Sequence, residues 1–188
     1  MSLTRIIAAA GAVLVVAAGA ALGPRLLPRA SAPAVREIVV LPVYDTYVNA
    51  SKPDDSFGSA RQLRADANPQ MRVYLRFTVP GAPERLVGAH LRLHANAPDR
   101  VGPLVAPVHS AHWTDDITWK TAPPVGEPRA QGSTAEAGSW VSVDVRHLVS
   151  GPGLVDLALV SQDKTAVNYS SREDGEGNAP RLVLQFSP

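Results

Sequence analysis

Short runs in which apolar and polar residues alternate constrain the fold of this chain more than any other feature. Between Met71 and Val79 every odd position is apolar, and the even positions hold Arg, Tyr, Arg and Thr. The same alternation recurs over residues 89–95, 140–146 and 182–186. A period of two is that of a β-strand with one buried face, so these segments are predicted to be strands.

Further short runs, separated by Pro, Gly, Asn and Asp, bring the number of expected strands to nine or ten. Seventeen prolines among 188 residues are spread along the chain, nearly twice the usual ~5%. That density argues against a helix bundle. Residues 37–188 are therefore predicted to form an all-β domain, an antiparallel β-sandwich of the jelly-roll kind. The weaker strand candidates are residues 37–49, 62–66, 104–110, 154–161 and 166–171, and residues 121–138 are expected to be a long loop.

The N-terminus is typical of an exported protein. Arg5 precedes an apolar run from Ile6 to Leu22, and Ala18-Gly19-Ala20 offers a small-residue cleavage site. Residues 1–22 are therefore expected to be a signal peptide, or a signal anchor if they are not cleaved. Residues 23–36, rich in Pro and Ala, are expected to be a linker. The domain that follows is expected to be secreted or extracellular, or held at a membrane by residues 6–22.

Charge and cysteine content exclude several functions. The formal net charge of +1 becomes −2 once Arg5, Arg25 and Arg29, the charged residues of positions 1–32, are left out. Such a mildly acidic domain gives no reason to expect a nucleic-acid partner. Since the chain contains no cysteine, it has no disulfide framework, thiolate metal site or cysteine nucleophile.

Two neighbouring strands could present a polar face. Arg72, Tyr74 and Arg76 share one side of the first predicted strand, and Arg92 and His94, with His90, share one side of the next. If these strands pair, guanidinium, phenol and imidazole groups line one surface. Guanidinium groups suit carboxylates, so such a surface would fit an acidic polysaccharide. The alternative is an ordinary solvated sheet face.

Signatures of enzymes are weak. The chain has no HExxH, GxSxG or GxGxxG motif, so it is not expected to be an enzyme. A small polysaccharide lyase remains an alternative, in which Tyr74 and His94 act as base and acid while Arg76 neutralises the uronate carboxylate.

Two oxygen-rich segments are candidates for a calcium site. Residues 45–49 and 171–176 supply carboxylates and carbonyls, the ligands that calcium prefers. Most of the aromatic residues are expected to fill the core, and Trp113 and Trp119 are expected to fill core or corner positions.

Eight segments in order resemble one family. The match covers about residues 40 to 186 and resembles the DNRLRE (disaggregatase-related) domain family, which includes the alginate-binding group numbered ninety-six among carbohydrate-binding modules. The matching pieces are Asp45–Asn49, Asp55–Ser59 with Leu63–Asp66, Val73–Phe77, Ala89–Leu93, Trp113–Thr114, Ile117–Pro123, Trp140–Val145, and Ser170–Glu173 with Pro180–Val183.

The resemblance implies a secreted accessory β-sandwich that binds carbohydrate, with calcium in some members. It makes Asp45 and Glu173 the candidates for a calcium-bearing corner. It makes Arg72, Tyr74, Arg76 and Arg92 candidates for a glycan-binding face. The strand pattern adds His94 to these candidates. The resulting hypothesis is a noncatalytic module for a polysaccharide or cell-surface glycan. A structural or adhesion domain of the cell surface without a small ligand stays open beside it.

Overall fold

The computed structural model describes residues 34–110, 112–162, 164 and 166–188. The expected signal or anchor segment over residues 1–22 lies outside them, as does the expected linker over residues 23–36 except for its last three residues. The chain from Pro33 to Pro188 is one compact unit. Among the described residues, no helix has the length and apolar character needed to cross a membrane.

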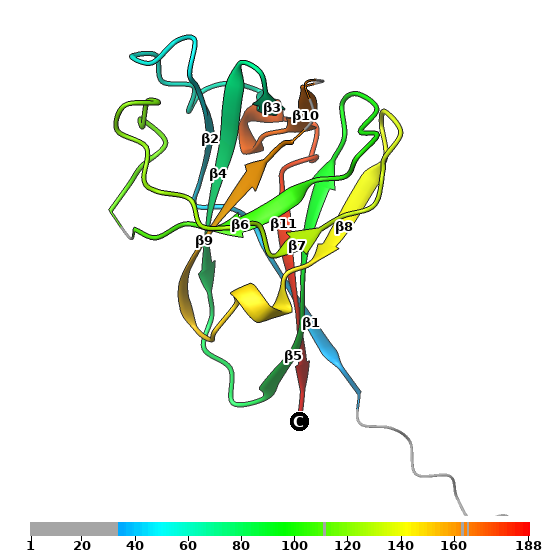
Figure 1. Cartoon of the computed structure of the whole chain (residues 1–188). Helices are drawn as coiled ribbons and strands as arrows, with labels where there is room; N and C mark the ends of the chain where they lie inside the picture. Colours follow the sequence, from blue (N-terminus) through cyan, green and yellow to red (C-terminus); the bar gives the residue numbers. More distant parts are fainter. Residues whose placement is uncertain (1–33, 111, 163, 165) are drawn as a thin grey trace, which may run out of the picture. The chain divides into compact units, whose positions relative to one another are not determined.

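The regular secondary structure of the described unit is almost entirely β-strand, which confirms the all-β prediction (Figure 1). Two single turns of 3₁₀ helix, η1 (Arg146–Leu148) and η2 (Arg172–Asp174), interrupt them. The two-residue strand β7 lies within the segment expected to be a loop. The strands are β1 (Arg36–Val40), β2 (Tyr44–Asn49), β3 (Gln62–Ala67), β4 (Gln70–Val79), β5 (Arg85–His94), β6 (Leu104–Pro107), β7 (Ala130–Gln131), β8 (Trp140–Asp144), β9 (Gly153–Val160), β10 (Val167–Ser170) and β11 (Arg181–Ser187).

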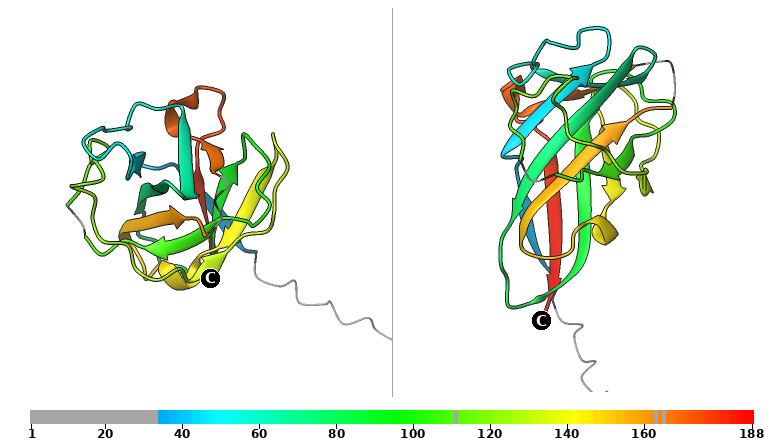
Figure 2. Two further views of the ribbon diagram at one scale, coloured as in Figure 1. Left: turned by 45° about the horizontal axis from the view of Figure 1, so that its top comes forward. Right: turned by 60° about the vertical axis from the view of Figure 1, so that its left-hand side comes forward.

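The strands form two antiparallel sheets, as expected for a β-sandwich (Figures 1 and 2). The smaller sheet has the order β1-β11-β5-β8. The larger has the order β10-β3-β4-β9-β6-β7, with β2 also paired to β4. Consecutive strands β4 and β5 therefore lie in different sheets, so the pairing on which the shared polar face depended does not form.

The alternating residues meet between the sheets as predicted. Leu75 and Phe77 of β4 and Leu91 and Leu93 of β5 are fully buried in one apolar core. Burial of such side chains is the main stabilising contribution available to a chain without disulfides. The core lies wholly within the compact unit of residues 33–188.

A second, smaller apolar cluster lies on the outer side of the larger sheet. The long connection between β6 and β7 lays Trp113 and Ile117 against Tyr74 of β4 and Val48 of β2. Trp119 packs against the same cluster. Packing positions for Trp113 and Trp119 are thus confirmed, and the outer side of β4, which the alternation predicted to be polar and exposed, is partly covered.

Candidate functional site

The five predicted glycan-binding residues fall on two separate surfaces. Arg72, Tyr74 and Arg76 lie on the outer side of β4 in the larger sheet, and Arg92 and His94 lie on the outer side of β5 in the smaller one. Since the apolar core separates the two sheets, these residues cannot form one joint face. The expectation of a shared surface is corrected accordingly.

Arg76 is a structural residue. It is 5% exposed, and its Nε and Nη2 donate to the two carboxylate oxygens of Asp156 at 2.7 and 3.1 Å. Its Nη1 donates to the carbonyl of Trp113 at 2.9 Å, and the Trp113 indole N–H donates to Asp156 at 3.1 Å. We call Arg76, Asp156 and Trp113 the arginine lock. Because all three guanidinium nitrogens donate to Asp156 or to the covering loop at Trp113, this guanidinium is not available to a glycan.

Tyr74 is likewise enclosed. Its side chain is fully buried, and its hydroxyl donates to the carbonyl of Pro123 at 3.0 Å. Burial raises the pKa of this phenol, with Arg72 acting in the opposite direction. Tyr74 and His94 belong to opposite sheets, so the structure does not assemble the base and acid that the lyase alternative requires.

Arg92 and His94 lie on the outer side of the smaller sheet, where two residues that the strand pattern did not single out join them. His94 faces Trp140 of β8 across the sheet, and Arg92 faces Arg181 of β11. The guanidinium carbons of Arg181 and Arg92 lie 4.6 and 5.3 Å from the Trp140 ring centroid. The His94 ring meets the indole edge to face at 5.4 Å. We call these four residues the Trp140 platform.

The Trp140 platform is accessible and positively charged. Arg92 is exposed, and the other three side chains are half-buried. Among the residues that the structure describes, neither guanidinium forms an ion pair with a carboxylate; Arg181 donates to the carbonyl of Gly177. By contrast, Arg36, Arg76 and Arg172 all pair with Asp or Glu. Stacking on an indole leaves the N–H edge of a guanidinium free, so the platform can hold a carboxylate beside an apolar ring.

Sequence reasoning missed Trp140 and Arg181 for an identifiable reason. Alternation places both on the outer sides of their strands, and this signal is visible in the sequence. Their meeting depends on β5 lying between β8 and β11, which the sequence pattern does not specify.

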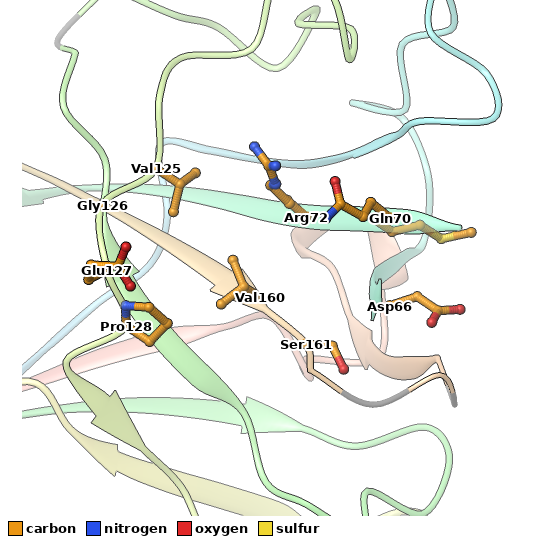
Figure 3. Close-up of a pocket in the computed structure, with 10 residues that line it drawn as sticks. Asp66, Gln70, Arg72, Val125, Gly126, Glu127, Pro128, Val160 and Ser161 are labelled. Carbon is orange, nitrogen blue, oxygen red and sulfur yellow. The ribbon is translucent and has the colours of Figure 1, made fainter. Parts of the chain in front are cut away.

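Arg72 borders a different feature, a cavity of about 350 Å³ on the outer side of the larger sheet (Figure 3). Its guanidinium carbon lies 4.7 Å from the ring centroid of Trp119. The loop that covers Tyr74 continues through residues 125–128 and forms one wall of this cavity, which Arg72 lines from β4.

The two residues predicted to hold calcium lie side by side although 128 positions separate them. Asp45 is 1% exposed, and its Oδ2 accepts the backbone N–H of Arg172 at 2.9 Å. Oδ1 of Asp45 and Oε2 of Glu173 are both buried without a hydrogen-bond partner among the described residues. The Arg172 guanidinium lies 2.6 Å from Glu173, 3.1 Å from Asp115 and 3.9 Å from Asp45.

This acidic corner (Asp45, Glu173, Asp115 and Arg172) carries more negative than positive charge. With all three carboxyls ionised, one guanidinium leaves a formal charge of −2. Burial is the main cause that raises the pKa of Asp45 to about 7. The hydrogen bond from the Arg172 backbone N–H lowers this pKa, and the nearby charge of Glu173 raises it. Two neighbouring carboxyl groups, each with one buried oxygen that lacks a hydrogen-bond donor, and the formal charge of −2 that the corner reaches once all three carboxyls are ionised fit a divalent cation that prefers oxygen ligands.

The described side chains supply only part of the ligand set of a calcium ion. Within the described ranges, no three His, Cys, Asp or Glu side chains come close enough to hold an ion by themselves. Calcium takes six to eight oxygens. Asp45 and Glu173 would therefore supply the charged ligands, and backbone carbonyls and water would supply the rest.

A two-sheet antiparallel sandwich with a tryptophan and arginines on an open sheet face has the architecture of a noncatalytic carbohydrate-binding module. The comparison with known families agrees: residues 37–186 match the model of carbohydrate-binding module family 96, and the chain belongs to that family. No curated protein matches the chain.

Proposed function

We propose that this protein is a secreted carbohydrate-binding module that holds an acidic polysaccharide on the Trp140 platform. The observation that carries the proposal is the pair of arginines, Arg92 and Arg181, stacked against one accessible tryptophan without carboxylate partners. Family membership supplies the carbohydrate ligand. These two guanidinium groups, which have no carboxylate partner among the described residues, supply the preference for an acidic ligand.

The chemistry of a uronate residue matches this arrangement. The axial C–H face of a pyranose is apolar and packs on an indole, while the carboxylate accepts hydrogen bonds from guanidinium N–H groups. His94, against the edge of the Trp140 ring, helps to fix the indole. A neutral sugar would leave both guanidinium groups without an anionic partner, so alginate and similar uronate polymers are the preferred class.

We further propose that Asp45 and Glu173 hold a calcium ion at the acidic corner. Bound calcium would supply positive charge to the buried carboxylate of Asp45 and the half-buried carboxylate of Glu173. Asp45 belongs to β2 and Glu173 to η2, so the ion would stabilise the junction between these elements. The acidic corner and the Trp140 platform share no residue, so calcium has a structural role here.

Residues 1–22 are proposed to export the module. Expression in a secreting host, followed by N-terminal sequencing, tests this: cleavage after Ala20 indicates a signal peptide. An intact N-terminus in the membrane fraction indicates an anchor over residues 6–22. Retention of the intact protein inside the cell would contradict export.

Binding is tested on residues 33–188 by isothermal titration calorimetry with alginate oligosaccharides, in the presence of calcium and in the presence of a chelator. Uncharged cello-oligosaccharides serve as the comparison. Trp140→Ala is expected to weaken alginate binding about tenfold, as for a central aromatic contact. Arg64→Gln is the matched control, because Arg64 is an exposed arginine on β3 of the other sheet.

Failure to bind alginate or any other uronate polymer would overturn the proposal and favour a structural or adhesion domain without a small ligand. Release of unsaturated uronate products, followed by ultraviolet absorbance, would contradict a noncatalytic role and favour the lyase alternative.

A further inference from the structure

The larger sheet carries a cavity that the proposed function does not use (Figure 3). Its volume of about 350 Å³ is at the small end of the range of about 300–1,000 Å³ for ligand sites. That size suits one monosaccharide unit. Its walls come from the β3–β4 hairpin, the end of β9 and residues 125–128 of the loop that crosses the sheet.

The cavity combines an apolar side with polar groups. Val125, Pro128 and Val160 supply apolar side chains, and Glu127 lies on the same segment as Val125 and Pro128 (Figure 3). Asp66, Gln70, Arg72, Glu127 and Ser161 supply the polar groups. Apolar side chains next to hydrogen-bonding groups suit a sugar ring, whose C–H groups form its faces and whose hydroxyls project mainly from its rim.

The cavity is preformed. The Asp66 side chain is 7% exposed, and its Oδ1 accepts the backbone N–H of Asn68 at 3.0 Å, which fixes the carboxylate. Stacking on Trp119 fixes Arg72. A backbone hydrogen bond of 2.9 Å from the N–H of Gly126 to the carbonyl of Pro107 fixes the loop. A ligand would therefore bind without paying to order these walls.

The charge of the cavity differs from that of the Trp140 platform. Asp66 and Glu127 contribute two negative charges against the one positive charge of Arg72, so a uronate would be repelled. Carboxylate oxygens instead accept hydrogen bonds from sugar hydroxyls, which Gln70 can also bind. We propose that this cavity is a second carbohydrate subsite, which takes one neutral, hydroxyl-rich sugar unit.

The two sites lie on the outer sides of opposite sheets, with the apolar core between them. A single module could thus hold an acidic polymer on one face and a neutral glycan on the other. Such a module would link two polysaccharides instead of binding one chain twice.

The test uses ¹⁵N-labelled residues 33–188 and the methyl glycosides of glucose, galactose and mannose. At least one is expected to shift the backbone amide signals around Asp66, Gln70 and Glu127. Asp66→Asn with Glu127→Gln should weaken that binding at least tenfold. The side-chain carbonyl that Asp66→Asn introduces can still accept the Asn68 N–H, so the turn is preserved. Trp140→Ala is the matched control and should leave neutral-sugar binding unchanged. Saturation with alginate oligosaccharide should also leave it unchanged.

The possible results distinguish the cavity subsite from the Trp140 platform. Absence of shifts at the cavity with all three glycosides would overturn the second subsite and leave the Trp140 platform intact. Binding of glucosamine in place of the neutral glycosides would overturn the neutral-sugar assignment. Neutral-sugar binding that Trp140→Ala abolishes would show a single shared site and overturn the second one. Neutral-sugar binding without alginate binding would overturn the proposed function and support the cavity.

Discussion

Arg76 and Asp156 are direct partners across β4 and β9, and their side chains form a two-point ion pair at 2.7 and 3.1 Å on the outer side of the larger sheet. Both side chains are more than nine-tenths buried. Trp113 covers the pair and bonds to both partners. An arginine that the sequence pattern marked for ligand binding thus anchors the loop that closes this part of the sheet.

Breaking the arginine lock is expected to destabilise the module strongly. Arg76→Met leaves the Asp156 carboxylate buried without its partner, which costs about 3–5 kcal/mol. Replacing both residues with apolar ones, Arg76→Met with Asp156→Leu, removes that uncompensated charge and should cost clearly less. Urea unfolding of residues 33–188 measures both free energies of unfolding. Equal losses in the single and double variants would contradict a coupled pair.

Alginate binding is expected to depend on both arginines of the Trp140 platform and on salt. A fully formed hydrogen bond to a charged group contributes about 1.5–3 kcal/mol. On an exposed face such a contact contributes less to the binding free energy. Arg92→Gln and Arg181→Gln should therefore each weaken binding about fivefold to tenfold. Raising the ionic strength from about 0.1 to 1 M shortens the Debye length from about 10 to 3 Å and should weaken wild-type binding further. Salt-independent binding in calorimetry would contradict the charge-based preference.

Local pattern was sufficient to predict the strands but not their partners. The alternation over 71–79 predicted β4 well, because a strand's own side chains report which face is buried. Sequential strands are neighbours about two-thirds of the time, yet the connection after Val79 carries the chain to the opposite sheet. Arg76 instead meets Asp156, eighty positions later, and no local signal marks that contact.

The acidic corner was predictable for a different reason. Asp45 and Glu173 were paired by their place in an ordered series of family-like segments, and the structure brings them together. Trp140 and Arg181 belong to the same series, but recognising the Trp140 platform requires the strand order of the smaller sheet.

Stability is expected to fall at alkaline pH because of Tyr169. Its ring is fully buried and its hydroxyl donates to Asp99. Burial is the main cause that raises the pKa of Tyr169, and the hydrogen bond to Asp99 raises this pKa further. In the unfolded chain the pKa is about 10. The stabilising contribution is therefore complete below about pH 10 and is lost as the pH rises above it, because only the unfolded chain releases the proton.

Urea unfolding midpoints measured between about pH 8 and pH 11 check this expectation. Tyr169→Phe should lower stability at neutral pH by about 1–3 kcal/mol, because Oδ2 of Asp99 loses the Tyr169 hydroxyl while Oδ1 keeps the backbone N–H groups of Val101 and Gly102, and should flatten the decline above pH 10. A decline of the same steepness in this variant would assign the alkaline sensitivity to other groups, of which Tyr74, also with a raised pKa, is the first to test.

Calcium is expected to raise the melting temperature of residues 33–188 through the acidic corner. A ligand at about one hundred times its dissociation constant stabilises the folded state by about 2.7 kcal/mol, which for a domain of this size is a rise of about 5–10 °C. The double variant Asp45→Asn with Glu173→Gln should lose that rise. Without calcium its stability at neutral pH should stay close to that of wild type, because loss of the Arg172–Glu173 ion pair is offset by removal of two buried carboxylate oxygens that lack hydrogen-bond partners. Asp54→Asn, at an exposed carboxylate paired with Lys120, should keep the full rise. Differential scanning calorimetry with calcium and with chelator measures all three proteins, and a wild-type melting temperature that calcium does not change would rule out the corner as a calcium site.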